Sequence, residues 1–228
     1  MPAPALVLFD IDGTLIRRAG PHHRQALVEA VRRVTGLEST TDNIPVQGML
    51  DPDILGIMMK NAGASAAHIR GSMPELIRIA QAVYVRTCPD IRRKVCPGVR
   101  RILAALLRHE IPVGLVTGNL TKIAWKKMEQ AGLSPYFRFG AFSDTAKDRA
   151  SLARLAIRHA RREKWIDRDA LISLIGDHPN DIRAAQANGI RSIAVATGVE
   201  PSEILANYKP DLLLPDLRSL RLDQLLLK

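Results

Sequence analysis

The stretch that decides the fold is Leu6-Val7-Leu8-Phe9-Asp10-Ile11-Asp12-Gly13-Thr14-Leu15. Its first four residues are apolar and have β-forming side chains, which is typical of a short strand buried on both faces. The apolar run ends at two aspartates one residue apart, and a glycine follows them. In open α/β sheets, ligands bind at the edge where parallel strands end. Because Asp and Gly are also ordinary turn residues, this stretch taken alone is better explained as a solvated turn than as a binding site, and the rest of the chain has to decide.

Similar apolar runs recur along the chain and alternate with stretches of helical spacing. The apolar runs predict strands at residues 6–9, 111–116, 139–142, 171–175, 192–196 and 212–214. Helical spacing lies between them, for example at 97–109 and 122–131. Strand and helix that alternate in this way predict an α/β fold with a parallel, doubly wound sheet.

One long interval interrupts the alternation. Residues 18–95 contain no strand pattern. Helical patterns occur there at 21–34, from 51 or 52 to 58, at 64–69 and at 74–87. An all-helical insertion of this size predicts a small second module. We therefore expect an α/β core domain of residues 1–17 and 96–228, and a helical domain of residues 18–95.

Composition and charge exclude several classes of protein. The chain has 228 residues, enough for a core domain and a smaller one. The apolar runs are far too short to span a membrane, and the first residues lack the pattern of a signal peptide, so we expect a cytoplasmic protein without membrane contact. Cys88 and Cys96 are too few for a disulfide framework, and reduced thiols are expected.

The net charge of +10 raises the question of a nucleic-acid partner. The basic residues are spread over many predicted helices and lack interleaved aromatic residues, which argues against such a partner. The densest cluster, at 161–164, is interpreted as a solvated helix face. A basic balance fits small anionic substrates equally well.

Three predicted strands end in polar residues of the same kind. They are followed by Asp10-x-Asp12, by Thr117-Gly118-Asn119 and by Gly176-Asp177-x-x-x-Asp181. In a parallel sheet all carboxyl ends lie on one edge, so these side chains are expected to converge. Four carboxylates close together repel one another unless a cation holds them, and oxygen ligands of this kind favour Mg²⁺. The pattern therefore implies a Mg²⁺ site.

These three motifs, in this order, resemble those of the haloacid dehalogenase superfamily of phosphohydrolases. The resemblance covers nearly the whole chain and is strongest for the phosphoglycolate phosphatase-like branch, in which a helical cap follows the first strand. It implies that Asp10 is the nucleophile and that Asp12 is the general acid and base. It also implies a metal held by the Asp10 carboxylate, the Asp12 backbone carbonyl and Asp177, with Asp181 orienting the ligands.

The resemblance further implies that Thr117 and the backbone amides around Gly118 and Asn119 bind phosphate oxygens. A threonine at a strand end is also common as a plain cap. The N-cap of the next helix is an alternative or additional role for Asp181.

The family's remaining motif is a basic residue that neutralises the phosphate and the nucleophile. Its usual lysine-proline pair is absent here, and the candidates are Lys147 and Arg149. We favour Arg149, because it stands at the start of the predicted helix and because a guanidinium binds phosphate through two hydrogen bonds.

Substrate choice is expected to lie in the cap. Leu50 stands where relatives carry a hydroxyl residue, and Asp51 is interpreted as a helix N-cap, with Pro52 at the first helical position. The run His22-His23-Arg24 could face the cleft, although surface positions are commoner for such residues. Lys60 and Lys94 lie in no context that suggests a Schiff base, and surface positions are expected for both.

The resulting hypothesis is a Mg²⁺-dependent phosphatase of a small phosphorylated metabolite, such as phosphoglycolate or a sugar phosphate, with an aspartyl-phosphate intermediate. A phosphomutase shares every motif and remains an alternative. A non-catalytic binding protein on the same fold is disfavoured, because a degenerate site has no need for the complete set of acids. The substrate and the oligomeric state stay open.

Overall fold

The sheet at the centre of the molecule has six parallel strands. The structure is a computed structural model and describes residues 2–17 and 20–226. The strands are ordered β3-β2-β1-β4-β5-β6. Their bounds are β1 Ala3–Phe9, β2 Val113–Val116, β3 Phe139–Ala141, β4 Ile166–Gly176, β5 Arg191–Val195 and β6 Leu212–Leu214. This confirms the predicted parallel α/β sheet.

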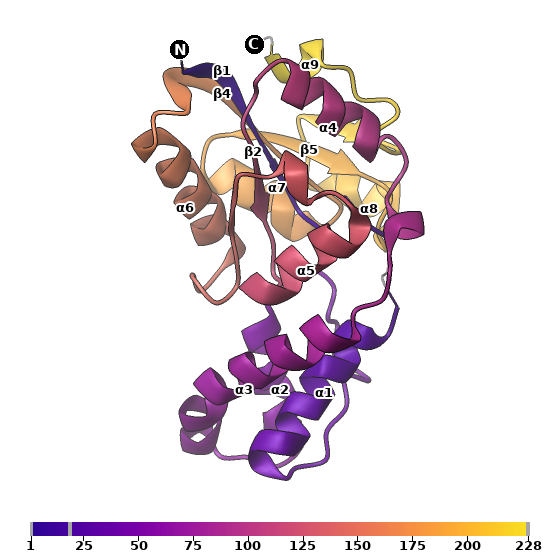
Figure 1. Cartoon of the computed structure of the whole chain (residues 1–228), viewed down its shortest axis with the longest axis vertical. Helices are drawn as coiled ribbons and strands as arrows, with labels where there is room; N and C mark the ends of the chain where they lie inside the picture. The colour runs from indigo at the N-terminus through magenta and orange to yellow at the C-terminus, as the bar shows by residue number, and fades with distance from the viewer. Residues whose placement is uncertain (1, 18–19, 227–228) are drawn as a thin grey trace.

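The two faces of the sheet are covered by different helices, as a doubly wound sheet requires (Figure 1). Alternate residues of β1 point to opposite faces. Val7 and Phe9 pack in the cluster with α4 (Val99–Arg108) and α5 (Thr121–Ala131). Leu6 and Leu8 pack in the cluster with α6 (Arg149–Arg162) and α7 (Pro179–Ala187). Because β1 is buried on both faces, its apolar run is unbroken, as the sequence indicated.

Three helices between β1 and α4 form a bundle below the sheet in Figure 1. They are α1 (His22–Thr35), α2 (Asp51–Asn61) and α3 (Ala66–Thr87). The remaining elements are α8 (Ser202–Asn207), α9 (Asp223–Leu226) and the 3₁₀ turns η1 (Arg92–Lys94) and η2 (Ser134–Tyr136). The bundle has its own apolar cluster, which Leu120 and Ile123 at the start of α5 complete. The bundle is therefore packed against the N-terminal end of α5.

Two elements differ from their predicted bounds. Helix α3 is continuous through Pro74, where two separate helices were expected. Buried side chains that follow the proline, such as Leu76 and Tyr84, pack in the bundle, and this packing outweighs the hydrogen bond that proline removes. Strand β4 begins at Ile166, opposite Ala3, and not at residue 171. The exposed charged residues at 167–169 hide this early part from an apolar pattern.

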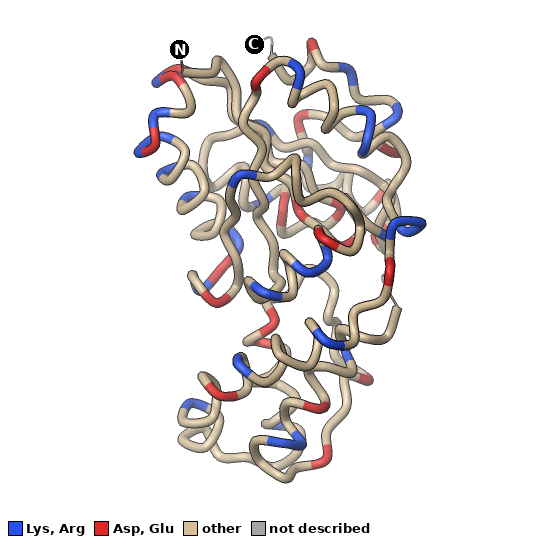
Figure 2. Tube along the Cα trace, in the orientation of Figure 1, with Lys and Arg blue, Asp and Glu red and all other residues tan. Residues whose placement is uncertain are grey.

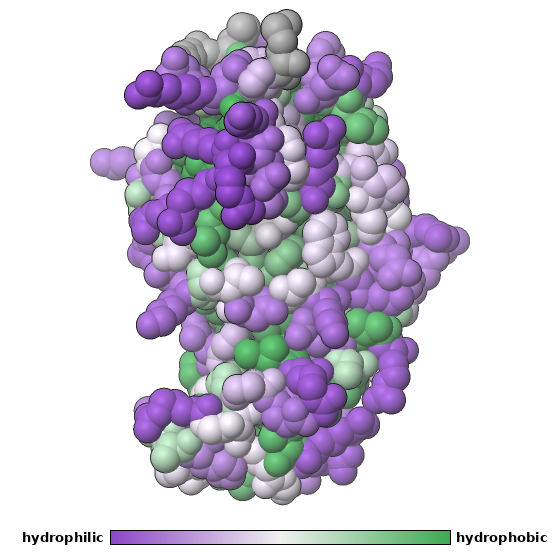
Figure 3. Space-filling view, turned by 60° about the vertical axis from the view of Figure 1, so that its left-hand side comes forward, coloured by the Kyte–Doolittle hydropathy of each residue, from purple (hydrophilic) through white to green (hydrophobic). Residues whose placement is uncertain are grey.

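Charged residues lie on both parts of the molecule (Figure 2). The face in Figure 3 is mostly hydrophilic, with apolar side chains in small separate groups. A local gathering of basic residues occurs on α6, where Arg154, Arg158 and Arg161 line a groove together with Arg191. Among the described residues, no helix is both long enough and apolar enough to cross a membrane.

Candidate active site

The ends of β2, β1 and β4 lie side by side, because these strands are neighbours in the sheet. Phe9 of β1 pairs with Leu115 of β2 and with Ile175 of β4. The next residue, Asp10, donates its backbone N–H to the carbonyl oxygen of Ile175. The three strand ends that the sequence singled out therefore meet at one edge of the sheet, as predicted.

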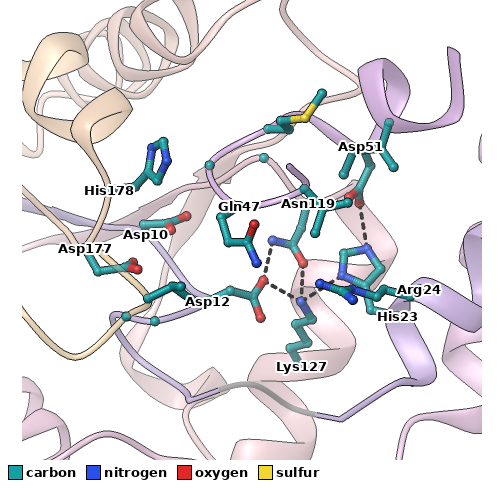
Figure 4. A pocket seen from close by; sticks show the side chains of 18 of the residues that line it. Asp10, Asp12, His23, Arg24, Gln47, Asp51, Asn119, Lys127, Asp177 and His178 are labelled. Carbon is teal, nitrogen blue, oxygen red and sulfur yellow. Dashed lines mark hydrogen bonds and ion pairs between the residues drawn. The ribbon is translucent and has the colours of Figure 1, made fainter. Parts of the chain in front are cut away.

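Asp10, Asp177 and Asp181 form a compact, buried carboxylate cluster. One carboxylate oxygen of each lies within 4.8 Å of the others. The Asp12 side chain is not part of this group, because its carboxylate points to the opposite side of the cavity (Figure 4). The structure thus brings together three of the four acids that the sequence assigned to a metal site.

The local fold fixes each member of the carboxylate cluster. Asp177 accepts a hydrogen bond from the Thr14 hydroxyl at 2.9 Å. Gly13 has a φ of 88°, and a Cβ there would lie 2.1 Å from Oδ2 of Asp177, so only glycine fits. Asp181 is the third residue of α7 and accepts the backbone N–H of His178 in a capping box. The N-cap itself is His178, so the N-cap role expected for Asp181 is replaced by this reciprocal one.

Arg149 is the cation that faces the cluster. Its Nη1 donates to Oδ1 of Asp10 at 3.0 Å, and its Nε lies 3.3 Å from Oδ1 of Asp181. It is the first residue of α6, is buried and lines the cavity described below, whereas Lys147 is exposed and does not line it. The geometry therefore favours Arg149 over Lys147 as the basic residue at this site.

Burial and mutual repulsion alter the acidity of the cluster. Burial first, and then the charges of Asp10 and Asp181, raise the pKa of Asp177 well above its ordinary value. Burial also raises the pKa of Asp181 to about 7, against the opposing effect of the Arg149 guanidinium. The carboxylates in turn raise the pKa of Arg149, although burial alone would lower it. One guanidinium is too little positive charge for three buried acids.

The carboxylate cluster fits a divalent cation. Oδ1 of Asp181 is buried and accepts no hydrogen bond from any described residue. Its contact with Nε of Arg149 at 3.3 Å is an ion pair without hydrogen-bond geometry. A buried carboxylate oxygen that accepts no hydrogen bond is costly, and a hard cation such as Mg²⁺ would satisfy it. Three carboxylate oxygens so close together match the donor type that Mg²⁺ prefers.

Asp12 belongs to a different set of contacts. Its Oδ2 accepts from Nζ of Lys127 at 2.5 Å and from Nδ2 of Asn119 at 2.8 Å. Burial alone would raise the pKa of Asp12, but the charge of Lys127 and these hydrogen bonds outweigh it, so the pKa is lowered. The two acids of the Asp10-x-Asp12 motif therefore lie in contrasting surroundings.

The contacts of Lys127 continue into the helical bundle (Figure 4). Its Nζ lies 3.2 Å from Nδ1 of His23, whose Nε2 lies 3.0 Å from Oδ2 of Asp51. The same Asp51 oxygen accepts the backbone N–H of Leu120 at 2.9 Å. The interpretation of Asp51 as the N-cap of α2 is therefore wrong. Leu50 is the N-cap position, and the Asp51 carboxylate turns to the start of α5 because an unpaired backbone N–H is available there.

A cavity of about 800 Å³ lies between the sheet edge and the bundle. Asp10, Asp12 and Arg149 line it from the core, and His23 and Arg24 line it from α1. Lys94 is exposed, as expected, and also lines the cavity, whereas His22 and Lys60 are not among its lining residues. The cavity is large enough for a small phosphorylated molecule.

The three residues of the Thr117-Gly118-Asn119 segment differ in whether they line the cavity. Gly118 and Asn119 line the cavity, but Thr117 does not. The Thr117 hydroxyl is fully buried and accepts from Nδ2 of Asn119 at 2.8 Å. Gly118 lies against the bundle, since a Cβ there would be 2.1 Å from the Met49 carbonyl oxygen. The role of Thr117 as a direct phosphate ligand stays a prediction.

Sequence reasoning did not identify Lys127 or Thr14 as residues of the site. It also did not identify Asn119 as a partner of Asp12. A signal for Lys127 was present, because buried positions on α5 recur at helical spacing and Lys127 falls among them. These positions are Ile123, Ala124, Lys127, Met128 and Ala131. A lysine on the apolar side of a helix needs a polar partner, which would have marked it as unusual.

Comparisons with known proteins agree with this geometry. The family model described as haloacid dehalogenase-like hydrolase matches residues 4–189. Phosphoglycolate phosphatase 1 of Pseudomonas aeruginosa is 26% identical over 95% of this chain and 78% of its own length. A protein of Caldanaerobacter subterraneus, provisionally named the pyrophosphatase PpaX, is 27% identical over 92% of this chain and 90% of its own.

Among solved structures, β-phosphoglucomutase of Clostridium difficile has a TM-score of 0.69 at 18% identity. It covers 97% of this chain and 95% of its own. At this level of identity the likeness concerns the fold alone. The sheet, the bundle and their connection are thus shared with solved structures.

Proposed function

The chain belongs to the haloacid dehalogenase-like hydrolase family, and we propose that it is a Mg²⁺-dependent phosphatase of small phosphomonoesters. The nucleophile is Asp10, and the reaction passes through an aspartyl-phosphate. The observation that carries this proposal is the pairing of Asp10 with Arg149 at 3.0 Å, next to Asp177 and Asp181, at the floor of an 800 Å³ cavity.

In the first half-reaction, a carboxylate oxygen of Asp10 attacks the phosphorus of the bound ester. The new O–P bond forms as the bond between phosphorus and the alcohol oxygen breaks. Asp12, on the other side of the cavity, gives its proton to the departing alkoxide. The products of this step are the free alcohol and phosphorylated Asp10.

In the second half-reaction, Asp12 takes a proton from water. The water oxygen bonds to phosphorus, and the bond to Asp10 breaks, which releases inorganic phosphate and restores the carboxylate. Asp12 is again protonated and ready for the next ester. One proton thus shuttles between Asp12 and the oxygen that leaves or attacks.

The remaining residues stabilise charge. Arg149 donates to the Asp10 oxygen and lines the cavity, and its remaining N–H donors bind a phosphate oxygen. Mg²⁺, when bound by Asp10, Asp177 and the Asp12 carbonyl, supplies positive charge for the phosphoryl oxygens. Asp181 orients the ligands through Arg149 and α7. The backbone amides of Gly118 and Asn119 complete the phosphate site.

We also propose that residues 18–95 act as a cap domain over a core of residues 1–17 and 96–228. The support is the contact between the bundle and the core at the cavity. Asp51 donates its backbone N–H to the Gly118 carbonyl, and Asn180 donates its side-chain amide to the Gly48 carbonyl. A closed cap excludes bulk water, which strengthens charge stabilisation at the phosphoryl group.

The test is a phosphate-release assay with Mg²⁺ over a panel of phosphomonoesters and pyrophosphate. We expect release from at least one small monoester and loss of that release in Asp10→Asn. Conversion between hexose monophosphate isomers without net phosphate release would favour a phosphomutase. No release from any member by the folded protein would overturn the phosphatase proposal.

A further inference from the structure

Lys127 is a buried lysine whose surroundings the family motifs do not explain. Its side chain is 1% exposed. Its Nζ contacts Oδ2 of Asp12 and Oδ1 of Asn119, both at 2.5 Å, and Nδ1 of His23 at 3.2 Å. A lysine ammonium has three N–H donors, so these three acceptors match them one to one. Each acceptor comes from a different segment of the chain.

Burying an ammonium group is unfavourable, and a well-packed apolar side chain at the same position usually gives equal or better stability. The ion pair with Asp12 is therefore poorly explained as a device for folding. Its location is more informative, because Asp12 and Lys127 both line the cavity. The pair thus lies on the wall of the cavity that the proposed function assigns to the ester.

The contacts restrain Asp12 in a specific way. Oδ2 of Asp12 accepts two hydrogen bonds, from Lys127 and from Asn119. No described residue donates to Oδ1, and the side chain is 39% exposed on the cavity side. Oδ2 of Asp12 is thus held by two hydrogen bonds, while Oδ1 is free to face the cavity. A single held orientation of this kind is what proton transfer to a bound substrate requires.

The bundle fixes Lys127 in turn. The two contacts of His23 fit an imidazole protonated on Nε2, which donates to Asp51 and accepts from Lys127 at Nδ1. Asp51 is anchored by the backbone N–H of Leu120. The result is a continuous chain of hydrogen bonds from Asp12 through α5 to α1 and α2.

We propose that Lys127 is a positioning residue, which holds the Asp12 carboxylate so that its free oxygen faces the leaving oxygen of the ester. His23 supports Lys127 in this role. The inference rests on the proposed phosphatase function and deepens it. It implies that Lys127 matters most where the leaving group needs a proton.

The experiment compares Lys127→Met with the wild-type protein on two esters at saturating Mg²⁺. Glycerol 2-phosphate releases an alkoxide that needs a proton, whereas p-nitrophenyl phosphate releases a stable anion that does not. The quantity measured is kcat/KM, because it reports the steps up to departure of the alcohol. Lys122→Met is the matched control, since Lys122 is exposed on the same helix.

We expect Lys127→Met to lower kcat/KM for glycerol 2-phosphate by about 10²-fold and for p-nitrophenyl phosphate by less than about threefold. Lys122→Met should change neither. Asp12→Asn should likewise lower kcat/KM far more for glycerol 2-phosphate than for p-nitrophenyl phosphate. The double variant Asp12→Asn/Lys127→Met should have the same kcat/KM as Asp12→Asn, because Lys127 acts through Asp12.

Equal losses on both esters, or a double variant in which the two losses multiply, would overturn the inference and leave the phosphatase proposal standing. If Lys127→Met does not melt cooperatively, His23→Leu serves instead, with a smaller loss of the same selectivity expected and an unselective loss counting against the inference. A wild-type protein that releases phosphate from neither ester would overturn the proposed function itself.

Discussion

The two acids of the Asp10-x-Asp12 motif are separated by a single residue and face opposite kinds of surroundings. Asp10 lies in the carboxylate cluster with Asp177, Asp181 and Arg149, all supplied by the α/β core. Asp12 lies in a network with Lys127 of the core and with His23 of the bundle. Among the described residues, the carboxylate cluster sets three acids against one cation, Arg149, whereas Asp12 is paired with Lys127.

The two proposed roles of this short motif rest on this difference. The carboxylate cluster fits an added cation, and its acids follow the ends of β1 and β4 or lie at the start of α7. The Asp12 network needs no added ion, but it depends on the bundle lying against α5. Changes in the core should therefore affect all phosphoryl chemistry, while changes at the boundary with the bundle should affect selected steps.

The largest expected effect is that of Asp10→Asn. Loss of the nucleophile should lower phosphate release from every ester, p-nitrophenyl phosphate included, by about 10⁴-fold or more. Asp12→Asn should keep far more of its kcat/KM for p-nitrophenyl phosphate. Similar losses in the two variants on this ester would contradict the division of roles between the two acids. Steady-state assays of both purified variants provide the comparison.

Next in size is the loss of Arg149. Arg149→Met removes the cation that faces Asp10, and we expect phosphate release at saturating Mg²⁺ to fall by about 10² to 10³-fold. Lys147→Met, two residues earlier and exposed, should stay within about twofold of wild type. The reverse ranking in the same assay would assign the basic role to Lys147.

A smaller effect is expected where the bundle approaches the core. A Cβ at Gly118 would lie 2.1 Å from the Met49 carbonyl oxygen, so Gly118→Ala should push the bundle away from the sheet edge. We expect KM to rise about tenfold, the loss that about 1.4 kcal/mol of binding free energy gives. Gly56→Ala, in α2 with open space around it, is the control and should leave KM unchanged. An unchanged KM in Gly118→Ala would argue against docking of the bundle during catalysis.

The smallest expected effect is the pH dependence of the thermal stability of the metal-free protein. The pKa values of Asp177 and Asp181 are raised in the folded protein, so both favour folding below their ordinary pKa and lose this contribution as pH rises toward and through about 7. We expect the Tm of the metal-free protein to fall by about 3 °C per pH unit between pH 5 and 7, and saturating Mg²⁺ to reduce this slope. Thermal melts with EDTA or Mg²⁺ measure it, and Asp181→Asn should flatten the metal-free slope. A metal-free Tm that rises over this range would contradict the repulsion described for the cluster.

Most of the carboxylate cluster could be predicted from sequence. Asp10 and Asp177 follow apolar runs directly, and parallel topology is enough to place such residues on one edge. Arg149 was favoured over Lys147 from its place at a helix start, and the structure brings it to Asp10. Local patterns succeed here because the strands themselves carry the residues to the site.

The network of contacts around Asp12 could not be predicted in the same way. His23 and Asp51 meet Lys127 only because the bundle packs on the start of α5, and no local pattern encodes that packing. The Asp51 carboxylate was assigned to its own helix, where a local rule applies, but a backbone N–H of α5 takes it. The Thr117 hydroxyl accepts a hydrogen bond from Nδ2 of Asn119, and its role at the phosphate stays a prediction.

The most direct test of the central claim is to trap the phosphorylated protein. Asp12→Asn should form the aspartyl-phosphate from p-nitrophenyl phosphate and hydrolyse it slowly, since the base for water is absent. Acid quenching followed by peptide mass spectrometry should then find one phosphoryl group, and it should lie on Asp10. A phosphoryl group on another residue, or steady phosphate release without any phosphorylated protein, would contradict the account.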